Sequence, residues 1–289
     1  MSNNEPAAEG DPYLDAIAET SDDTGVVESP IQPGDVLGID IGGSGIKGAP
    51  VDVETGLLRR ERLKILTPEG AEPEDVSKVV AELVSHFEWT GRVGCTFPGP
   101  VRTGVVLGAA NVSKRWIGLN ADTEFTGLLG LPVTVVNDAD AAGVAEIAHG
   151  AAKGVHGTVI MLTFGTGIGS AIFADGRLLT NTEFGHLQMW GDSAERKISA
   201  SARERMGISF EKWAKEYVQE YFEYLERLFN PDLFIVGGGI SRKFEKWVPH
   251  LHVSAPIIPA QLRNNAGIVG AAMFARGVVG SHTSADYDS

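Results

Sequence analysis

The sequence predicts an α/β protein made of two domains with a cleft between them. The order strand–strand–strand–helix–strand occurs twice, at about 36–97 and, more loosely, at 158–236. Three of the predicted strands run directly into glycine-rich turns. The chain has 289 residues, 43% of them hydrophobic, which is enough for one large or two modest domains. Because each layered α/β unit buries its own core, a repeated order predicts two units and a ligand site between them.

The expected boundaries follow from this repetition and from the composition of the two ends. We expect a disordered acidic tail over 1–34, a small α/β domain over 35–137 together with about 265–280, a large α/β domain over 138–264, and a second disordered tail over 281–289.

The first half opens with apolar segments of strand length. Residues 36–41 are predicted as a buried strand, and 46–53 and 57–65 as two more, joined by a turn at Glu54-Thr55-Gly56. A helix with Pro73 in its first turn is then predicted, because apolar residues recur at helical spacing. These residues are Val76, Val79, Val80, Leu83, Val84 and Phe87. A short strand over 93–97 ends at Pro98-Gly99-Pro100.

The second half repeats this order of strands and helices after a strand at 133–136 and an alanine-rich helix at 139–152. Strands are predicted at 158–164 and 170–174, with a turn at Asp175-Gly176. Further along the chain we expect an amphipathic helix over about 210–225, a strand over 233–236 and a last helix over about 266–279.

Cysteine content and hydropathy exclude several classes of protein. Cys95 is the only cysteine, so neither an intramolecular disulfide nor a cysteine-built zinc site is possible. A lone thiol suits a reducing cytoplasm. No run of 18 or more apolar residues exists, and the N-terminus lacks the pattern of a secretory signal, so we expect no membrane segment.

The net charge of −14 is concentrated near the N-terminus. Residues 1–34 hold eight acidic residues and no Lys or Arg. Such a polar, acidic segment buries too little apolar surface to offset its ordering entropy, and we therefore expect it to be disordered. The global charge consequently says little about the ligand.

Three glycine-rich turns follow predicted strands, at 38–47, 163–170 and 236–241. Glycines let a phosphate approach backbone N–H groups, and an acid beside phosphates suits a water-held Mg²⁺. One such turn alone would equally fit an ordinary hairpin, whereas three in this order favour a phosphate-donor site. The predicted donor residues are Asp40 (also Mg²⁺, through water), Gly42, Gly43, Ser44, Gly45, Lys47, Gly165, Thr166, Gly167, Gly238 and Gly239.

Two further segments make the pattern specific. Glu183-Phe184-Gly185-His186 resembles the Glu-x-Gly-His signature of the ROK sugar kinases (repressor, open reading frame, kinase). Asn137-Asp138-Ala139-Asp140 resembles the Asn-Asp-Ala-Asn run around their catalytic aspartate. The match covers about residues 36–279. It implies the two-domain, actin-like ATPase (ribonuclease H-like) sugar kinase fold, with an interdomain cleft.

The resemblance implies that Asp138 is the catalytic base. A sugar hydroxyl has a very high pKa and attacks phosphorus poorly, so a carboxylate that orients it and takes its proton suits this reaction. Taken alone, Asp138 would be interpreted as a helix N-cap ahead of the alanine-rich segment, and the alternative for His186 is a structural histidine. The resemblance assigns the sugar hydroxyls to Asn111, Asn137, Asp138, Glu183 and His186.

The chain departs from the family pattern in two places. Many ROK kinases bind structural zinc through a cysteine cluster after that histidine, but residues 187–197 contain no cysteine, so we expect no zinc site. ROK repressors carry an N-terminal helix-turn-helix, whereas this chain begins with an acidic segment that would repel DNA phosphates. We therefore expect no nucleic-acid partner. The resemblance also implies a homodimer.

The missing cysteine cluster and the segments 96–101 and 111–116 resemble the polyphosphate glucokinases, a subgroup that phosphorylates the 6-hydroxyl of glucose. A polyanion needs basic residues along its path, and positions 196–205 hold four of them with one acid. A solvated surface would explain the same charges. The candidate groove residues are Lys114, Arg115, Arg196, Lys197, Arg203 and Arg205, with Lys47 and Lys64 as further candidates.

Three hypotheses about function remain open. The first is a cytoplasmic, Mg²⁺-dependent glucokinase that uses polyphosphate and possibly ATP. The second is a strictly ATP-dependent ROK kinase acting on a hexose or an N-acyl-hexosamine. The third is a non-catalytic sugar sensor on the same fold, against which the intact Asp138 and the three glycine turns argue.

Overall fold

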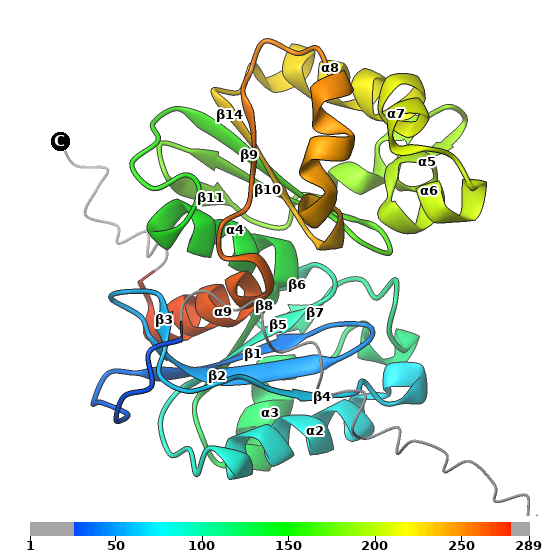
Figure 1. Ribbon diagram of the computed structural model, residues 1–289. Coiled ribbons are helices and arrows are strands. Elements are labelled where there is room, and N and C mark those ends of the chain that lie inside the picture. Colours follow the sequence, from blue (N-terminus) through cyan, green and yellow to red (C-terminus); the bar gives the residue numbers. More distant parts are fainter. Residues whose placement is uncertain (1–25, 279–289) are drawn as a thin grey trace, which may run out of the picture.

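The structure, a computed structural model, describes residues 26–278 (Figure 1). Most of the two predicted tails, residues 1–25 and 279–289, lies outside the described residues. Residues 26–34 were included in the N-terminal tail by the sequence analysis, and the first of them, 26–29, run beside β3 (Leu57–Leu58). The backbone N–H of Val27 donates to Leu58 O at 3.0 Å, and that of Ser29 donates to Arg59 O at 3.2 Å. The acidic tail is therefore shorter than 34 residues.

The first sheet has the strand order β3-β2-β1-β5-β8, with β4 also paired to β2. β1–β2 is an antiparallel pair, whereas β1–β5 and β5–β8 are parallel. Helices α2 (Pro73–His86) and α3 (Ala121–Leu129) cover its outer face (Figure 1). The strands of this sheet are β1 (Val36–Ile41), β2 (Ile46–Asp52), β3, β4 (Leu63–Ile65), β5 (Val93–Phe97) and β8 (Val133–Asn137).

The strand predicted over 57–65 is interrupted, and this is a correction. β3 and β4 both pair with β2, but residues 60–62 between them do not. This stretch belongs to the charged run Arg-Arg-Glu-Arg at 59–62. Arg59 turns to Asp35 and Asp52, with N–O distances of 3.1 and 2.9 Å. The pairing with β2 therefore stops where the apolar alternation gives way to charged residues.

The second sheet repeats the order and directions of the first, as β11-β10-β9-β14-β15. The predicted repetition of strands is thus confirmed. Its strands are β9 (Thr158–Phe164), β10 (Ile168–Ala174), β11 (Arg177–Leu179), β14 (Leu233–Gly237) and β15 (Ile257–Pro259). The outer face is covered by α5 (Glu195–Ile198), α6 (Ala200–Met206), α7 (Phe210–Trp213) and α8 (Gln219–Phe229). A π-helical turn over Ala214–Val218 joins α7 to α8, so the predicted amphipathic helix is continuous.

Helices α4 (Asp138–His149) and α9 (Ala266–Arg276) lie between the two sheets (Figure 1). Small residues let their backbones touch. A Cβ added at Gly270 of α9 would lie 1.8 Å from Ala141 O of α4. A Cβ added at Gly94 of β5 would lie 1.9 Å from Ala271 O of α9. The central layer is therefore clamped by backbone contacts on both sides of α9.

A buried carboxylate ties the C-terminal end of α4 to the segment that leads into α9. Glu146 is fully buried, and its oxygens accept backbone N–H groups of Ala151 (2.7 Å), Gln261 (3.1 Å) and Leu262 (2.7 Å). Three donors compensate the cost of burying this carboxylate. The contact fixes the chain immediately before Arg263.

The shorter elements complete the fold. A two-stranded pair of β6 (Val101–Arg102) and β7 (Val105–Val106) follows the turn at Pro98–Pro100, and a second pair joins β12 (Gln188–Met189) to β13 (Asp192–Ser193). The 3₁₀ turns that concern the site are η3 (Phe184–His186), η5 (Gly239–Lys246) and η7 (Arg263–Asn265). Within residues 26–278 no helix has the length and apolar content needed to cross a bilayer.

The close contact of α9 with α4 predicts an asymmetric effect of two glycine substitutions. Gly270→Ala should destabilise the protein by roughly 3 kcal/mol, because the new methyl group meets a backbone carbonyl that cannot move alone. Gly127→Ala in α3 is the control, since an added Cβ there meets nothing within 4 Å. It should be neutral or stabilising by about 0.5–1 kcal/mol. Urea unfolding measures both, and equal effects would contradict the packing described for α9.

Candidate active site

A cleft of about 510 Å³ opens between the two halves. It is lined by residues at the carboxyl ends of β1, β8, β9 and β14 and at the first turns of α4 and α9. Ligands of open α/β sheets bind in crevices outside the carboxyl ends of the strands. The cleft therefore lies where this architecture places its ligands.

The cleft brings together most of the residues predicted from the sequence. Those lining it are Asp40, Gly42, Gly43, Lys47, Asn111, Asn137, Asp138, Gly165, Thr166, Gly167, Glu183, His186, Gly238 and Gly239. Ser44 and Gly45 stand in the β1–β2 turn outside this lining. A Cβ added at Gly45 would lie 2.8 Å from Cε of Lys64, so this glycine accommodates a side chain of the same half.

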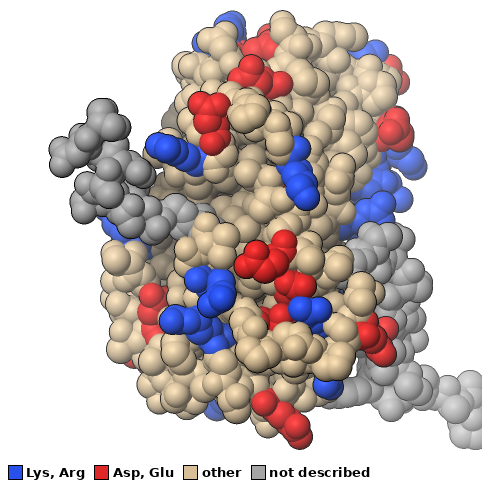
Figure 2. All heavy atoms as spheres, turned by 90° about the vertical axis from the view of Figure 1, so that its left-hand side faces the viewer, with Lys and Arg blue, Asp and Glu red and all other residues tan. Residues whose placement is uncertain are grey.

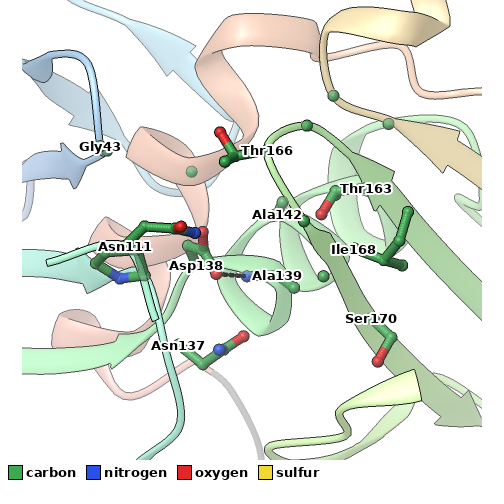
Figure 3. Close-up of a pocket in the computed structure, with 18 of the residues that line it drawn as sticks. Gly43, Asn111, Asn137, Asp138, Ala139, Ala142, Thr163, Thr166, Ile168 and Ser170 are labelled. Carbon is green, nitrogen blue, oxygen red and sulfur yellow. Dashed lines mark hydrogen bonds between the residues drawn. The ribbon is translucent and has the colours of Figure 1, made fainter. Parts of the chain in front are cut away.

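Asp138 is the first residue of α4 and lies in the middle of the cleft. In Figure 3, Gly43 and Asn111 lie on one side of it and Thr163 of β9 on the other. The N-cap of α4 is Asn137, whose Oδ1 accepts the N–H of Asp140 at 2.9 Å. Asn137 thus performs the capping role that Asp138 alone would have suggested. The Asp138 carboxylate is left to face the cleft.

The surroundings of Asp138 favour its protonated form. Burial raises the pKa of Asp138 to about 7, and the negative charge of Asp40 acts in the same direction. A hydrogen bond from Ala139 N, 2.8 Å from Oδ1, opposes the shift. A carboxyl group that titrates near neutral pH is suited to accept a proton and release it again.

Asp40 lies near the end of β1, and its two oxygens have different partners. Oδ1 accepts the hydroxyl of Thr96 at 2.8 Å, and Oδ2 lies 3.5 Å from Nζ of Lys47. The first turn of α9 closes over it, since a Cβ added at Gly267 would come within 2.8 Å of Asp40 Oδ1. These contacts hold the carboxylate toward the cleft.

The oxygen ligands in the cleft fit a hydrated Mg²⁺. Mg²⁺ in phosphoryl-transfer sites usually keeps several waters and takes one or two carboxylates together with substrate phosphates. Asp40 and Asp138 are two such carboxylates lining one cleft. Among residues 26–278 no group of three or more His, Cys, Asp or Glu side chains is arranged to hold a metal ion by itself.

Glu183, His186 and a third residue, Glu195, form a polar group in the cleft. His186 lies with Nε2 3.7 Å from Glu183 Oε2 and Nδ1 3.9 Å from Glu195 Oε1. Desolvation raises the pKa of Glu183, and the positive form of His186 opposes that shift. Glu195 Oε2 also accepts the N–H of Ile168 at 3.2 Å, so it supports the β9–β10 turn. The group presents several acceptors to a polyhydroxylated ligand.

Of the predicted groove residues, Lys47 lines the cleft, whereas Lys114 and Arg115 lie outside its lining and have partners of their own. Arg115 pairs with Glu72 at 3.2 Å and with Glu74 at 2.5 Å. Lys114 donates to Ala109 O and borders a second hollow beside the cleft. Phosphate binding by Arg115 would have to compete with both of its carboxylates.

The basic residues at 196–205 are likewise outside the lining of the cleft. Arg196 pairs with Asp192 at 3.2 Å, and Lys197 lies over the ring of Tyr217. Arg203 stacks on Phe210, with 4.1 Å between the guanidinium carbon and the ring centroid, and Arg205 donates to Arg196 O. Each of these four residues therefore has a local contact of its own.

The sequence analysis did not identify several residues that line the cleft. They are Glu195, Ser241, Arg242, Arg263 and Asn264. The run Ser241-Arg242-Lys243, which begins at the last residue of the glycine-rich turn at 236–241, was the one available signal for Arg242. Arg263 has φ = +48°, a left-handed conformation that costs a non-glycine residue energy and that the surrounding structure must support.

Known proteins include clear relatives of this chain. The sequence model that describes the ROK family matches residues 36–200 of this chain. The chain belongs to the ROK family. Polyphosphate glucokinase of Mycobacterium tuberculosis is 54% identical over 238 residues, covering 82% of this ROK chain and 89% of the relative. Polyphosphate glucokinase of Mycobacterium leprae is 50% identical over 238 residues, or 82% of this chain and 73% of the relative.

Solved structures of the ROK family have the same fold. The inorganic polyphosphate/ATP-glucomannokinase of Arthrobacter sp. strain KM superposes with a TM-score of 0.80 at 50% identity, covering 83% of this chain and 98% of that one. The ROK family glucokinase of Streptomyces griseus, in complex with glucose and AMPPNP, gives 0.71 at 28% identity, covering 84% and 99%. The predicted actin-like sugar kinase fold is thereby confirmed.

The raised pKa of Asp138 predicts how stability depends on pH. Between about pH 4 and pH 7 the folded protein holds a proton that the unfolded chain has released, so the free energy of unfolding falls as the pH rises. Above pH 7 the full cost of the buried charge is present. Asp138→Asn removes that cost, and its melting temperature should exceed that of the wild type at pH 8 by more than at pH 5.

Calorimetry at the two pH values measures the difference. Asp75→Asn, at a half-buried site on α2 where the carboxylate pairs with Lys78, is the control and should differ from the wild type by about the same amount at both pH values. A wild-type protein as stable as Asp138→Asn at pH 8 would contradict the burial described for this carboxylate.

Proposed function

We propose that this ROK protein is a glucokinase that transfers a phosphoryl group from inorganic polyphosphate, and also from ATP, to the 6-hydroxyl of glucose, giving glucose 6-phosphate. The observation that carries the proposal is the position of Asp138. This carboxylate, with a pKa near 7, stands in one cleft with the Glu183–His186–Glu195 group and with the three glycine turns. The polyphosphate glucokinases to which the chain is similar support the same reaction.

In this proposal the sugar lies on the side of Glu183 and His186. Their side chains, with Glu195 and Asn111, accept and donate hydrogen bonds to the ring hydroxyls, which orients the 6-hydroxyl toward Asp138. Asp138 takes the hydroxyl proton as the sugar oxygen bonds to phosphorus. The bond between that phosphorus and its bridging oxygen breaks, and the shortened polyphosphate leaves with the electron pair.

The donor lies against the glycine turns on the opposite side. Backbone N–H groups around Gly43, Thr166 and Gly239 can approach phosphate oxygens closely because no large side chain intervenes. Bound Mg²⁺ would neutralise charge on the transferred phosphoryl group, and Asp40 is the residue that would hold it, through water. Lys47 beside Asp40 adds a positive charge to the same end.

The path of a polyphosphate chain beyond the reacting phosphate follows Arg242 and Arg263. Both line the cleft, whereas the cluster at 196–205 does not. Arg242 follows the triple-glycine turn in η5, and Arg263 begins η7 just before α9. Guanidinium groups bind phosphate oxygens through charge-assisted hydrogen bonds. The rest of the polyphosphate chain would therefore extend from the reacting phosphate out of the cleft between η5 and η7.

Three broader properties belong to the same proposal. We expect Mg²⁺ as the metal, a homodimer as the oligomeric state and the cytoplasm as the location. The lone cysteine, Cys95, is fully buried in β5, and burial raises its pKa, so the thiol is unreactive in a reducing compartment. Sedimentation of the purified chain and metal-dependence assays test the first two properties.

The role of Asp138 as the base predicts the pH dependence of turnover. The value of kcat/KM for glucose should fall as the pH is lowered through about 7, because protonated Asp138 cannot accept the hydroxyl proton. Asp138→Asn should lose at least ~10²-fold in kcat while retaining glucose binding. A coupled assay of glucose 6-phosphate across pH 5–9 measures both. Near-normal turnover of this variant would remove Asp138 from the mechanism.

The donor path predicts different effects of two sets of variants. Arg242→Gln should raise the KM for long-chain polyphosphate roughly tenfold, because a charge-assisted contact is lost, and leave the KM for glucose unchanged. The double variant Arg196→Ala with Lys197→Ala tests the groove first inferred from the sequence, and on the path proposed here it should have a smaller effect. The KM for polyphosphate should also rise with salt, since exposed charges are screened over ~8–10 Å at 0.1–0.15 M.

Parallel assays with polyphosphate and ATP decide the donor. A larger effect of the 196–197 double variant than of Arg242→Gln would move the path to α5. If ATP alone supported turnover at every salt concentration, the ATP-dependent hypothesis would replace this one. Glucose bound without turnover on either donor would favour the sensor.

A further inference from the structure

Asn181 connects the two halves of the molecule beside the sugar end of the cleft. It follows β11, and its carboxamide makes two hydrogen bonds to one residue of the other half. Oδ1 accepts the N–H of Val101 at 2.8 Å, and Nδ2 donates to Val101 O at 2.9 Å. Val101 begins β6 directly after Pro98–Pro100, all three of which line the cleft. The side chain therefore pairs with a backbone segment as a neighbouring strand would.

The backbone of Asn181 is held by α4. Its N–H donates to Oδ2 of Asp140 at 2.8 Å, and Asp140 is 2% exposed and lies two residues after Asp138. The second oxygen of Asp140 has no hydrogen-bond partner among the described residues. The N–H of Asn181 is therefore the one hydrogen-bond donor to this buried carboxyl group there. Asn181 has φ = +59°, a left-handed conformation that asparagine tolerates better than most residues.

The residues after Asn181 are fixed in turn. Thr182 exchanges hydrogen bonds with Ser170 of β10: Ser170 Oγ donates to Thr182 O at 2.7 Å, and Thr182 Oγ1 donates to Ser170 O at 2.9 Å. Phe184 N donates to Ser170 Oγ at 3.0 Å. Glu183 lies between these anchored residues, and its side chain lines the cleft. The orientation of Glu183 thus depends on the anchoring of its neighbours.

We propose that Asn181 is a positioning residue for the sugar site, which holds the Glu183–His186 segment of one half against the Pro98–Pro100 turn of the other. This inference rests on the proposed function for the identity of the sugar. Asn181 is not among the residues lining the cleft, so it acts through Glu183 and the turn rather than by touching the substrate. Asp140 extends the connection to α4, and the three sugar-facing segments are then held in one mutual arrangement.

The test compares the affinity for glucose with the KM for the donor, both measured in the same variant. Asn181→Ala removes both contacts with Val101 and should weaken glucose affinity roughly tenfold, with the KM for the donor changed less than about twofold. Asp140→Ala, which leaves the Asn181 N–H without its acceptor, should have the same signature. Asp140→Asn can still accept this hydrogen bond through its carboxamide oxygen and should retain most of the glucose affinity.

Asn120→Ala provides the matched control for a general loss of stability. Asn120 caps α3 away from the cleft, its Oδ1 accepting Thr123 N at 3.0 Å. This variant should lower the melting temperature without changing glucose affinity. An Asn181→Ala variant that behaves in the same way would overturn the proposal, and so would an equal rise of the glucose and donor KM values.

Glucose affinity is measured by calorimetry without a donor, so that the inference and the proposed function fail separately. A wild-type protein that binds glucose but transfers no phosphate would refute the proposed kinase, while the comparison of Asn181→Ala with Asn120→Ala would still decide the positioning role. Active wild type with unchanged glucose affinity in Asn181→Ala would refute the positioning role alone.

Discussion

The backbones of α4 and α9 touch between the two sheets, and the geometry of the cleft depends on this contact. Gly270 leaves no room for a side chain against Ala141, and Gly94 leaves none against α9. Because both helices are fixed by backbone atoms, their first turns are fixed as well. Asp138 begins α4, and Gly267 in the first turn of α9 abuts Asp40. The two carboxylates of the cleft are therefore brought together by packing among alanines and glycines rather than by attraction.

This arrangement holds two negative groups near one another at a cost to stability. The pKa of Asp138 is raised to about 7 by burial and by Asp40, so ionised Asp138 is unfavourable in the absence of cations. Asn137 caps α4, and the Asp138 side chain is thereby left facing the cleft. The fully buried Glu146, at the other end of the same helix, has three backbone donors for its charge. One helix thus carries a structural carboxylate with three backbone donors and a carboxylate in the cleft with one, from Ala139, which is the arrangement expected when stability is sacrificed at a functional site.

The sequence predicted the parts of the fold that depend on local periodicity. β1, β5 and α2 have the expected extents, because alternation, apolar runs and helical spacing are read directly from neighbouring residues. The strand at 57–65 was overextended, since residues 60–62, within the charged run at 59–62, do not pair with β2. Arg263 and Glu195 were missed because nothing local marks them. Chain segments distant in sequence bring them into the cleft, in the case of Arg263 through the hydrogen bonds of Glu146 to the preceding residues.

The net charge of the whole chain also does not predict which ligand the cleft binds. The net charge is −14, and on the face shown in Figure 2 acidic and basic side chains are interspersed rather than gathered into one basic surface. Exposed charges farther than ~8–10 Å away are screened at physiological salt, so a ligand in the cleft responds mainly to the groups around it. Those groups include Lys47, Arg242 and Arg263 as well as the carboxylates. A polyanionic donor can consequently be bound by a strongly acidic protein, provided that its basic contacts lie within the cleft and the acids near them are matched to the sugar or to a metal ion.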